Sequence, residues 1–182
     1  CFTITSIDLS SFNTTQVVEL TTMFANCDAL TNIKLSSFDT RGVKSMSSMF
    51  AGCSSLTSLD ISNFRTNNVE RLDSMFNRCH KLISVDLSNF NTDSLLSMSY
   101  MFSECFSLKE IDLSAFKTDK VTTMSGLFSD CISLSSIEFG KFYTYSVANM
   151  SKMFYNCRSF IVLDLSTFDT DEVKDMSYMF SN

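Results

Sequence analysis

The chain has 182 residues with 14 basic and 20 acidic side chains, so its formal net charge at pH 7 is −6. An acidic chain does not neutralise phosphates, and nucleic acid is therefore excluded as an expected partner. Pro is absent and Gly occurs four times, so the turns are predicted to depend on Ser, Asn, Asp and Thr, which hydrogen-bond to nearby backbone.

A motif recurs every 26 residues, and 7 × 26 accounts for all 182 residues. In one copy, Leu82, Val85, Leu87 and Phe90 alternate with polar residues, which is typical of a short strand with one apolar side. Each copy carries Phe at the position of Phe90 and a large apolar residue at that of Leu87. These columns are predicted to stack into continuous ladders.

The second half of the copy predicts a helix of about three turns. Residues 95–105 carry apolar side chains at offsets 0, 3, 6, 7 and 10, which form one stripe at about 100° per residue. Thr92 and Asp93 precede this stripe, and one of them is predicted to cap the helix N-terminus. All 11 Met residues fall in two columns of the stripe, which indicates that they fill the core.

One unit cannot fold alone. Burying about nine apolar side chains at roughly 2 kcal/mol each contributes ~18 kcal/mol, and ordering its 26 residues costs ~1–2 kcal/mol each. The unit must therefore lie between copies of itself. Separately, no apolar run in the sequence approaches the ~18 residues that would cross a bilayer.

Strands about 4.8 Å apart stack more closely than helices 8–10 Å apart. We therefore predict a right-handed α/β solenoid with seven units, parallel strands on its concave face and short helices on its convex face. Residues 1–182 are expected to form a single domain within a longer array, because neither end differs in composition from the middle.

The seven cysteines share one column of the repeat, which predicts a ladder of buried thiols. Disulfides between neighbours are a second interpretation, although the odd number would leave one thiol unpaired. Zinc needs four converging ligands, which a straight column without Cys-x-x-Cys does not supply. No metal site and no cofactor are predicted. The column comprises Cys1, Cys27, Cys53, Cys79, Cys105, Cys131 and Cys157.

The outward side of the predicted strands carries a charged column, followed two positions later by a column of small residues. Stacked acids would repel one another by roughly 1 kcal/mol per adjacent pair in water. Solvent, counterions and serine hydroxyls would relieve this, as would a basic protein partner or weakly held Ca²⁺. The candidate partner-binding residues are Asp60, Asp86, Asp112, Glu138, Asp164, Ser62, Ser88 and Ser114.

No catalytic residues are predicted. The carboxylates of the charged column lack the differentiated environments that glycoside hydrolysis needs, and His80 has no repeated partner. Glycan binding usually involves exposed aromatic rings, and the strand columns are nearly free of them, with Tyr143 and Tyr145 at the rim.

The pattern Leu30-x-x-Ile33-x-Leu35-x-x-Phe38 resembles a leucine-rich repeat in which Phe replaces the usual Asn. More narrowly, residues 56–66 and 75–79 resemble the 26-residue surface-protein repeat related to the BspA-type leucine-rich repeats. The resemblance covers the whole chain. It implies a cell-surface or secreted setting and adhesion to host proteins, and it brings no active-site residue.

Two functions remain open. The first is a non-enzymatic protein-binding module of the adhesion type, with a protein ligand on the concave Ser/Asp face and no insertion into a membrane. The alternative is a structural array or spacer that stacks head to tail into a filament through its uncapped ends.

Overall fold

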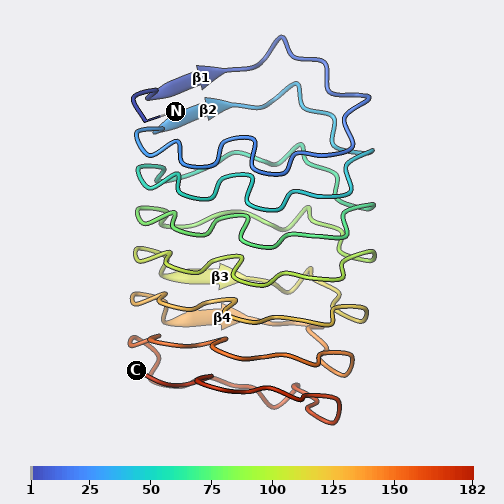
Figure 1. Ribbon diagram of the computed structural model, residues 1–182, viewed down its shortest axis with the longest axis vertical. Helices are drawn as coiled ribbons and strands as arrows, with labels where there is room; N and C mark the ends of the chain where they lie inside the picture. Colours follow the sequence, from blue (N-terminus) through green and yellow to red (C-terminus); the bar gives the residue numbers. More distant parts are fainter. Residues whose placement is uncertain (1) are drawn as a thin grey trace.

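The computed structural model describes residues 2–182, which wind into coils stacked one above another with the termini at opposite ends (Figure 1). Each coil is 26 residues long. Parallel bridges join residues 26 apart in an unbroken series, from the pair Glu19 and Ser45 to the pair Asn149 and Asp175. The repeat length predicted from the sequence is therefore confirmed.

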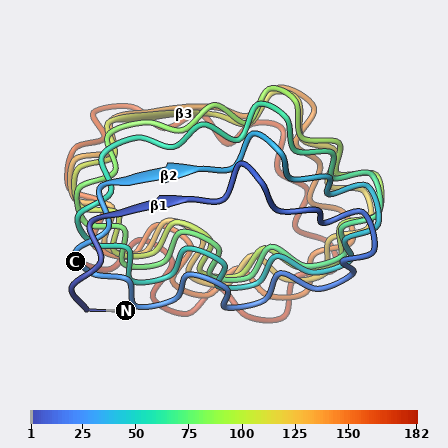
Figure 2. The ribbon, with the colours of Figure 1, turned by 90° about the horizontal axis from the view of Figure 1, so that it is seen from above.

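Four short strands lie on one long side of the flattened coil (Figure 2). They are β1 (Ser6–Asp8), β2 (Asn32–Lys34), β3 (Glu110–Asp112) and β4 (Ser136–Glu138). β1 pairs with β2 and β3 pairs with β4, both in parallel and in a register of 26 residues. We call these residues, with their equivalents in the other coils, the strand wall.

The prediction of helices is wrong, because none of residues 2–182 is helical. The opposite side consists of successive β-turns over residues 46–53 and their equivalents, which we call the turn wall. The Met49 N–H donates to the Met46 carbonyl (3.1 Å), and the Cys53 N–H donates to the Phe50 carbonyl (3.0 Å). A series of three-residue steps places apolar side chains inward at a spacing that also fits a helical stripe.

The remaining N–H groups of the turn wall bind the next coil. In one coil, the N–H of Ser48 donates to the Asp73 carbonyl (2.8 Å), and the N–H of Gly52 donates to the Asn77 carbonyl (2.7 Å). Donors that close turns alternate with donors that join coils. The backbone polar groups are satisfied without a helix, at the cost of fixing every coil in register with its neighbours.

Two positions in each turn-wall segment except the last have positive φ, such as Thr22 and Asn26 (both 58°). Most of these residues are not glycine, and the left-handed conformation costs them about 1 kcal/mol or more each. The bonds between coils hold the strained residues in place.

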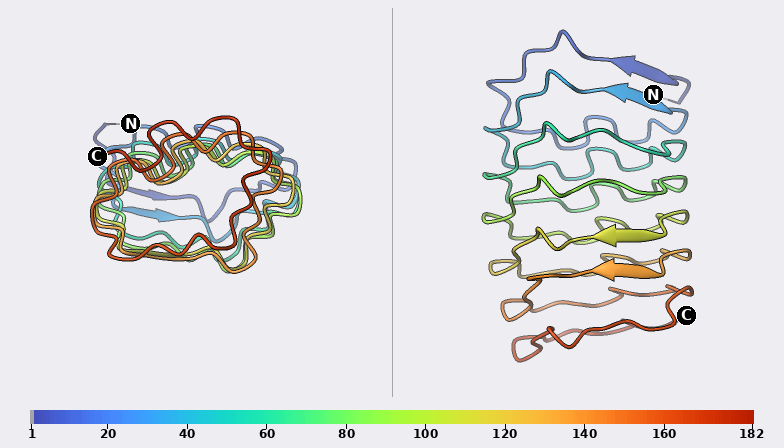
Figure 3. Two further views of the ribbon diagram at one scale, coloured as in Figure 1. Left: turned by 90° about the horizontal axis from the view of Figure 1, so that it is seen from below. Right: turned by 180° about the vertical axis from the view of Figure 1, so that it is seen from behind.

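The expected reason for curvature is absent, because the turn wall is joined from coil to coil through the backbone, as are the paired strands of the strand wall. Figure 1 and the two further views in Figure 3 show the coils stacked without a pronounced bend. We therefore use the terms strand wall and turn wall in place of concave and convex face. None of the described residues lies in a helix of the length and hydropathy needed to cross a membrane.

The core lies between the walls and consists of side-chain ladders. Along the turn wall, Phe rings stack from Phe24 to Phe180 with centroids 5.5 to 5.9 Å apart. Met46, Met98 and Met124 are fully buried. The prediction that Met fills the core is confirmed there, although Met176 near the C-terminal end is exposed.

The cysteines of the described chain form a ladder of free thiols, and no disulfide joins them. Cys1 lies outside the described residues. The Cys105 Sγ donates to the Phe76 carbonyl in the preceding coil (3.2 Å), and Cys131 repeats this contact with Phe102 (3.0 Å). Burial raises the pKa of the Cys105 thiol well above its ordinary value. The prediction of a buried thiol ladder is thus confirmed over these residues.

A second polar ladder was assigned the wrong role from the sequence. Thr92, expected to be a possible helix cap, is buried, and its hydroxyl donates to the Lys117 carbonyl in the next coil (2.9 Å). The same hydroxyl accepts the Lys117 N–H (2.8 Å). Equivalent bonds from threonine to the next coil occur at Thr14, Thr40, Thr66, Thr118 and Thr144.

Substituting Thr92 by Val should destabilise the fold, because it leaves the N–H and carbonyl of Lys117 without their partner. The expected loss is about 1–3 kcal/mol in the free energy of unfolding, measured in urea. Thr92→Ser is the matched control, since it keeps the hydroxyl and removes one methyl group. A Val variant at least as stable as the Ser variant would contradict the proposed role of the hydroxyl.

Candidate functional site

The predicted partner-binding residues all lie on the outer side of the strand wall. In β3, Ile111 is buried between the exposed side chains of Glu110 and Asp112. The register places Asp112 directly beside Glu138 of β4. The strand period of two therefore sets the acids of successive coils in one outward-facing column.

The aspartates of this column also shape their own coils. Asp60 accepts the Ser62 hydroxyl (2.7 Å) and the Ser62 N–H (3.1 Å) through Oδ1. This Asx turn leads into a β-turn, which is closed by a hydrogen bond from the Phe64 N–H to the Ile61 carbonyl (3.0 Å). The same contact from aspartate to a serine N–H occurs at Asp8, Asp86, Asp112 and Asp164.

These contacts favour the ionised carboxylates. The hydroxyl of Ser62, and to a lesser extent its N–H, lowers the pKa of Asp60 below its ordinary value. The pKa of Asp112 is lowered in the same way by Ser114, and the charge of Asp86 opposes this only as the smallest of its causes. The stacked acids are thus stabilised within each coil, as the serine explanation expected, and Lys34 adds an ion pair with Asp8 (2.9 Å).

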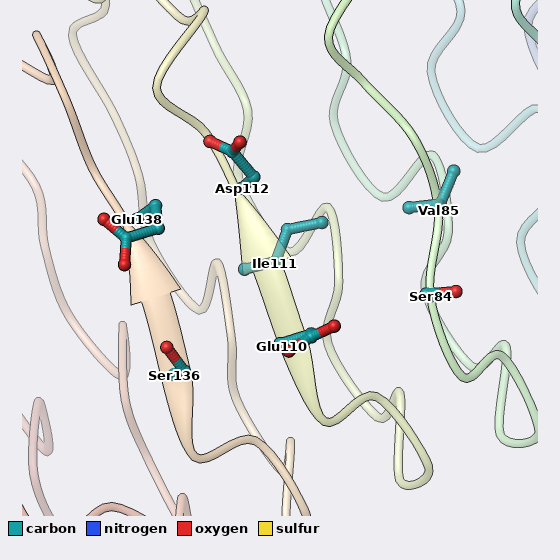
Figure 4. Close-up of a pocket in the computed structure, with 7 residues that line it drawn as sticks. All are labelled: Ser84, Val85, Glu110, Ile111, Asp112, Ser136 and Glu138. Carbon is teal, nitrogen blue, oxygen red and sulfur yellow. The ribbon is translucent and has the colours of Figure 1, made fainter.

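Between β3 and the preceding coil, the strand wall is hollowed. Within residues 2–182, the only strand paired with β3 is β4. A hollow of about 310 Å³ lies in this region (Figure 4). Figure 4 shows the carboxylates of Asp112 and Glu138 on adjacent strands, with Val85 across from Ile111. Its lining residues are Ser84, Val85, Glu110, Ile111, Asp112, Ser136 and Glu138.

A second hollow is basic and lies beside the residues that lead into the strands of the strand wall. Its volume is about 420 Å³, and it contains two lysines, Lys81 and Lys109. Between them in sequence, Ile83 leaves 49% of its surface exposed. Lys109 of the basic hollow and Glu110 of the acidic hollow are adjacent in sequence, so the two hollows adjoin where the chain enters β3. This pairing of charges was not predicted, because Lys81, Ile83 and Lys109 lie outside the acidic column.

The described residues contain no group of three or more His, Cys, Asp or Glu side chains able to hold a metal ion. His80 stacks on Phe106 with ring centroids 4.5 Å apart, and its Nε2 lies 3.7 Å from Glu104. These contacts pack His80 against its neighbouring coil.

Asp60→Asn should flatten the acid dependence of stability. A lowered pKa in the folded state makes a stabilising contribution that is present above the unfolded value of about 3.9 and is lost as the pH falls through the folded value. Asn retains an oxygen for the Ser62 N–H but does not titrate. The stability difference between wild type and variant, from urea unfolding at a series of pH values, should shrink below about pH 4. An unchanged difference would refute the role of the ionised form.

Comparisons with known proteins agree with this architecture. A family model described as "Mycoplasma protein of unknown function, DUF285" matches residues 1–110 and 82–182. The leucine-rich repeat protein TpLRR of T. pallidum is similar in structure, with a TM-score of 0.52 and 21% identity over 85% of this chain and 77% of that chain. A leucine-rich repeat protein from Bacteroides ovatus has a TM-score of 0.45 and 23% identity, over 84% and 42%. No curated protein matches the chain.

The likeness to TpLRR concerns the fold alone and supports a solenoid of leucine-rich-repeat type. The two matches to the family model overlap and together cover the whole chain. This family model is not specifically that of the BspA-type repeats, which the sequence pattern suggested. The chain belongs to the DUF285 family.

Proposed function

We propose that the chain is a non-enzymatic protein-binding module and that its ligand lies along the strand wall. The support comes from the adjoining hollows of opposite charge. The acidic one contains Glu110, Asp112 and Glu138, and the basic one contains Lys81 and Lys109. A partner with a basic row beside an acidic row would be complementary to both, and complementary charges give specificity and fast association.

The strand wall also offers apolar contact at the junction of the charges. Ile83 is half exposed, and Val85, which is partly exposed, lines the acidic hollow. A binding site with an apolar centre and a charged rim is typical of protein interfaces. The carboxylates of Asp86 and Asp112 are already held by serines, so these side chains would lose little conformational freedom when a partner binds.

The proposed setting is the cell surface or the secreted fraction, and the proposed role there is adhesion. The resemblance of residues 56–66 and 75–79 to the BspA-type surface repeat supports this setting.

Selection of random displayed peptides on the immobilised protein would test the strand wall. The enriched peptides should contain Lys or Arg, and Asp86→Lys with Asp112→Lys should weaken their binding about tenfold or more. Asp86→Asn with Asp112→Asn keeps an oxygen for each serine and should also weaken binding, which separates lost charge from a lost turn.

Glu19→Lys with Glu172→Lys makes the same change in net charge away from the strand wall and serves as the control. Equal binding by the strand-wall variants and this control would refute the proposal, as would a selection that enriches no peptide.

Head-to-tail stacking of residues 1–182 is the second candidate function, and the exposed ring of Phe180 supports it. Phe180 stacks on Phe154 with centroids 5.8 Å apart, and its relative exposure is 60%. A hollow of about 290 Å³ beside it is lined by Phe154, Phe160, Phe180 and further apolar residues. Within the array, every such ring is covered by the ring of the next coil. The first coil of a second copy would instead cover Phe180 with its exposed apolar side chains, which include Phe2 and Phe12.

For residues 1–182, the mass measured by light scattering should therefore rise with concentration. Phe180→Asp should abolish this rise, because a charge would replace the ring that stacks, whereas Asp86→Lys with Asp112→Lys should leave it intact. A mass that stays monomeric across the accessible concentrations would exclude the filament.

A further inference from the structure

One corner of the solenoid departs from its own repeat. The corner that follows the strand wall, residues 143–146 in the coil of β4, carries Tyr143 and Tyr145, whose relative exposures are 42% and 45%. The equivalent residues are Lys117 and Asp119 in the preceding coil, and both are Asp in the following one. Positions that repeat hold the coils together. The exposed aromatic pair occurs in one coil only, so the contacts shared by all the coils do not explain it.

The two rings form one surface because of the local backbone. Thr144 lies between them and is buried, so residues 143 and 145 point outward on the same side. Their ring centroids are 6.1 Å apart and their planes differ by 31°. Rings at this separation are in contact, so their exposed parts form one continuous aromatic surface, which we call the platform.

The backbone of the platform and one of its rings are held before any ligand binds. The Tyr143 carbonyl accepts the Thr118 hydroxyl (2.5 Å), and the Thr144 hydroxyl donates to the Asp169 carbonyl (2.6 Å). The Tyr145 hydroxyl donates to Asp119 (2.6 Å), which fixes the second ring. That contact also raises the pKa of Tyr145 above its ordinary value. The Tyr145 ring, held in this way, loses little entropy on binding.

Carboxylates lie in the coils on either side of the two tyrosines, at Asp119, which equals Tyr145 in the repeat, and at Asp169, which equals Tyr143. Asp169 accepts the Asp171 N–H through one oxygen (3.0 Å), which leaves the rest of its acceptor capacity to solvent. Lys117, which occupies the position of Tyr143 in the preceding coil, forms an ion pair with Asp93 (2.8 Å). The surroundings therefore offer carboxylate acceptors for the hydroxyl groups of a ligand lying on the rings.

We propose that Tyr143 and Tyr145 form a binding site for a neutral oligosaccharide, with consecutive sugar rings lying across the two tyrosines. The C–H faces of a pyranose are apolar and pack on flat aromatic rings, while its hydroxyls need acceptors at the edge of the platform. This site lies on a corner and not on the strand wall, so it does not depend on the protein-binding function proposed above.

Saturation-transfer NMR with chitotetraose, cellotetraose and maltotetraose would test the site. At least one of these probes should give a saturable signal with residues 1–182. Tyr143→Ala with Tyr145→Ala should weaken binding about tenfold or more, whereas Tyr143→Phe with Tyr145→Phe keeps the rings and should retain most of it. Tyr178→Asn removes an exposed tyrosine from the turn wall and should change nothing.

The proposal would be overturned if none of the three sugars bound the wild-type protein, or if binding survived the double Ala substitution. Tetramethylammonium and arginine serve as competing probes. A signal from either cation that depends on the two tyrosines, without one from any sugar, would also overturn it and assign the platform to a cationic ligand.

Discussion

Hydrogen bonding between coils is the constraint on which the structure depends. Each coil is too small to bury its own core, and its turn wall contains residues with unfavourable φ, such as Ser74 and Arg78. Both are held by bonds from their N–H groups to the next coil, at 2.8 Å each. The buried threonine and cysteine ladders extend the same arrangement to side chains. Stability therefore resides in the boundaries between coils, as in other repeat proteins.

The repeat, its length, the buried ladders and the outward acids could be predicted from the sequence, because each depends on spacing alone. The helices could not be excluded in this way. The spacing of the apolar side chains fits a helical stripe and fits successive β-turns of three-residue steps equally well. These side chains are Val43, Met46, Met49, Phe50 and Cys53. The choice depends on hydrogen bonds to a neighbouring coil, which no single unit of sequence shows. The many Ser, Thr and Asn side chains that compete with helices were the available signal.

The candidate site could likewise be predicted from the sequence only in part. The outward position of Asp86 and Asp112 follows from the strand period, but their bonds to Ser88 and Ser114 depend on the turn after each strand. A column also hides what differs between coils. The basic hollow around Lys81 and the tyrosines of the β4 coil are departures from the repeat, and an alignment of units presents them as noise. In a molecule whose shared positions serve folding, such departures are where recognition can reside.

The uniform coil length has a consequence for how such arrays change over generations. Deleting 26 consecutive residues removes one rung from every ladder together and returns the flanking rungs to register, whichever residue the deletion begins at. Deleting 25 shifts all later side chains by one position and turns the core phenylalanines away from their stacks. Recombination between coding repeats is therefore tolerated in whole multiples of the coil, so that the molecule can vary in reach while its cross-section stays the same.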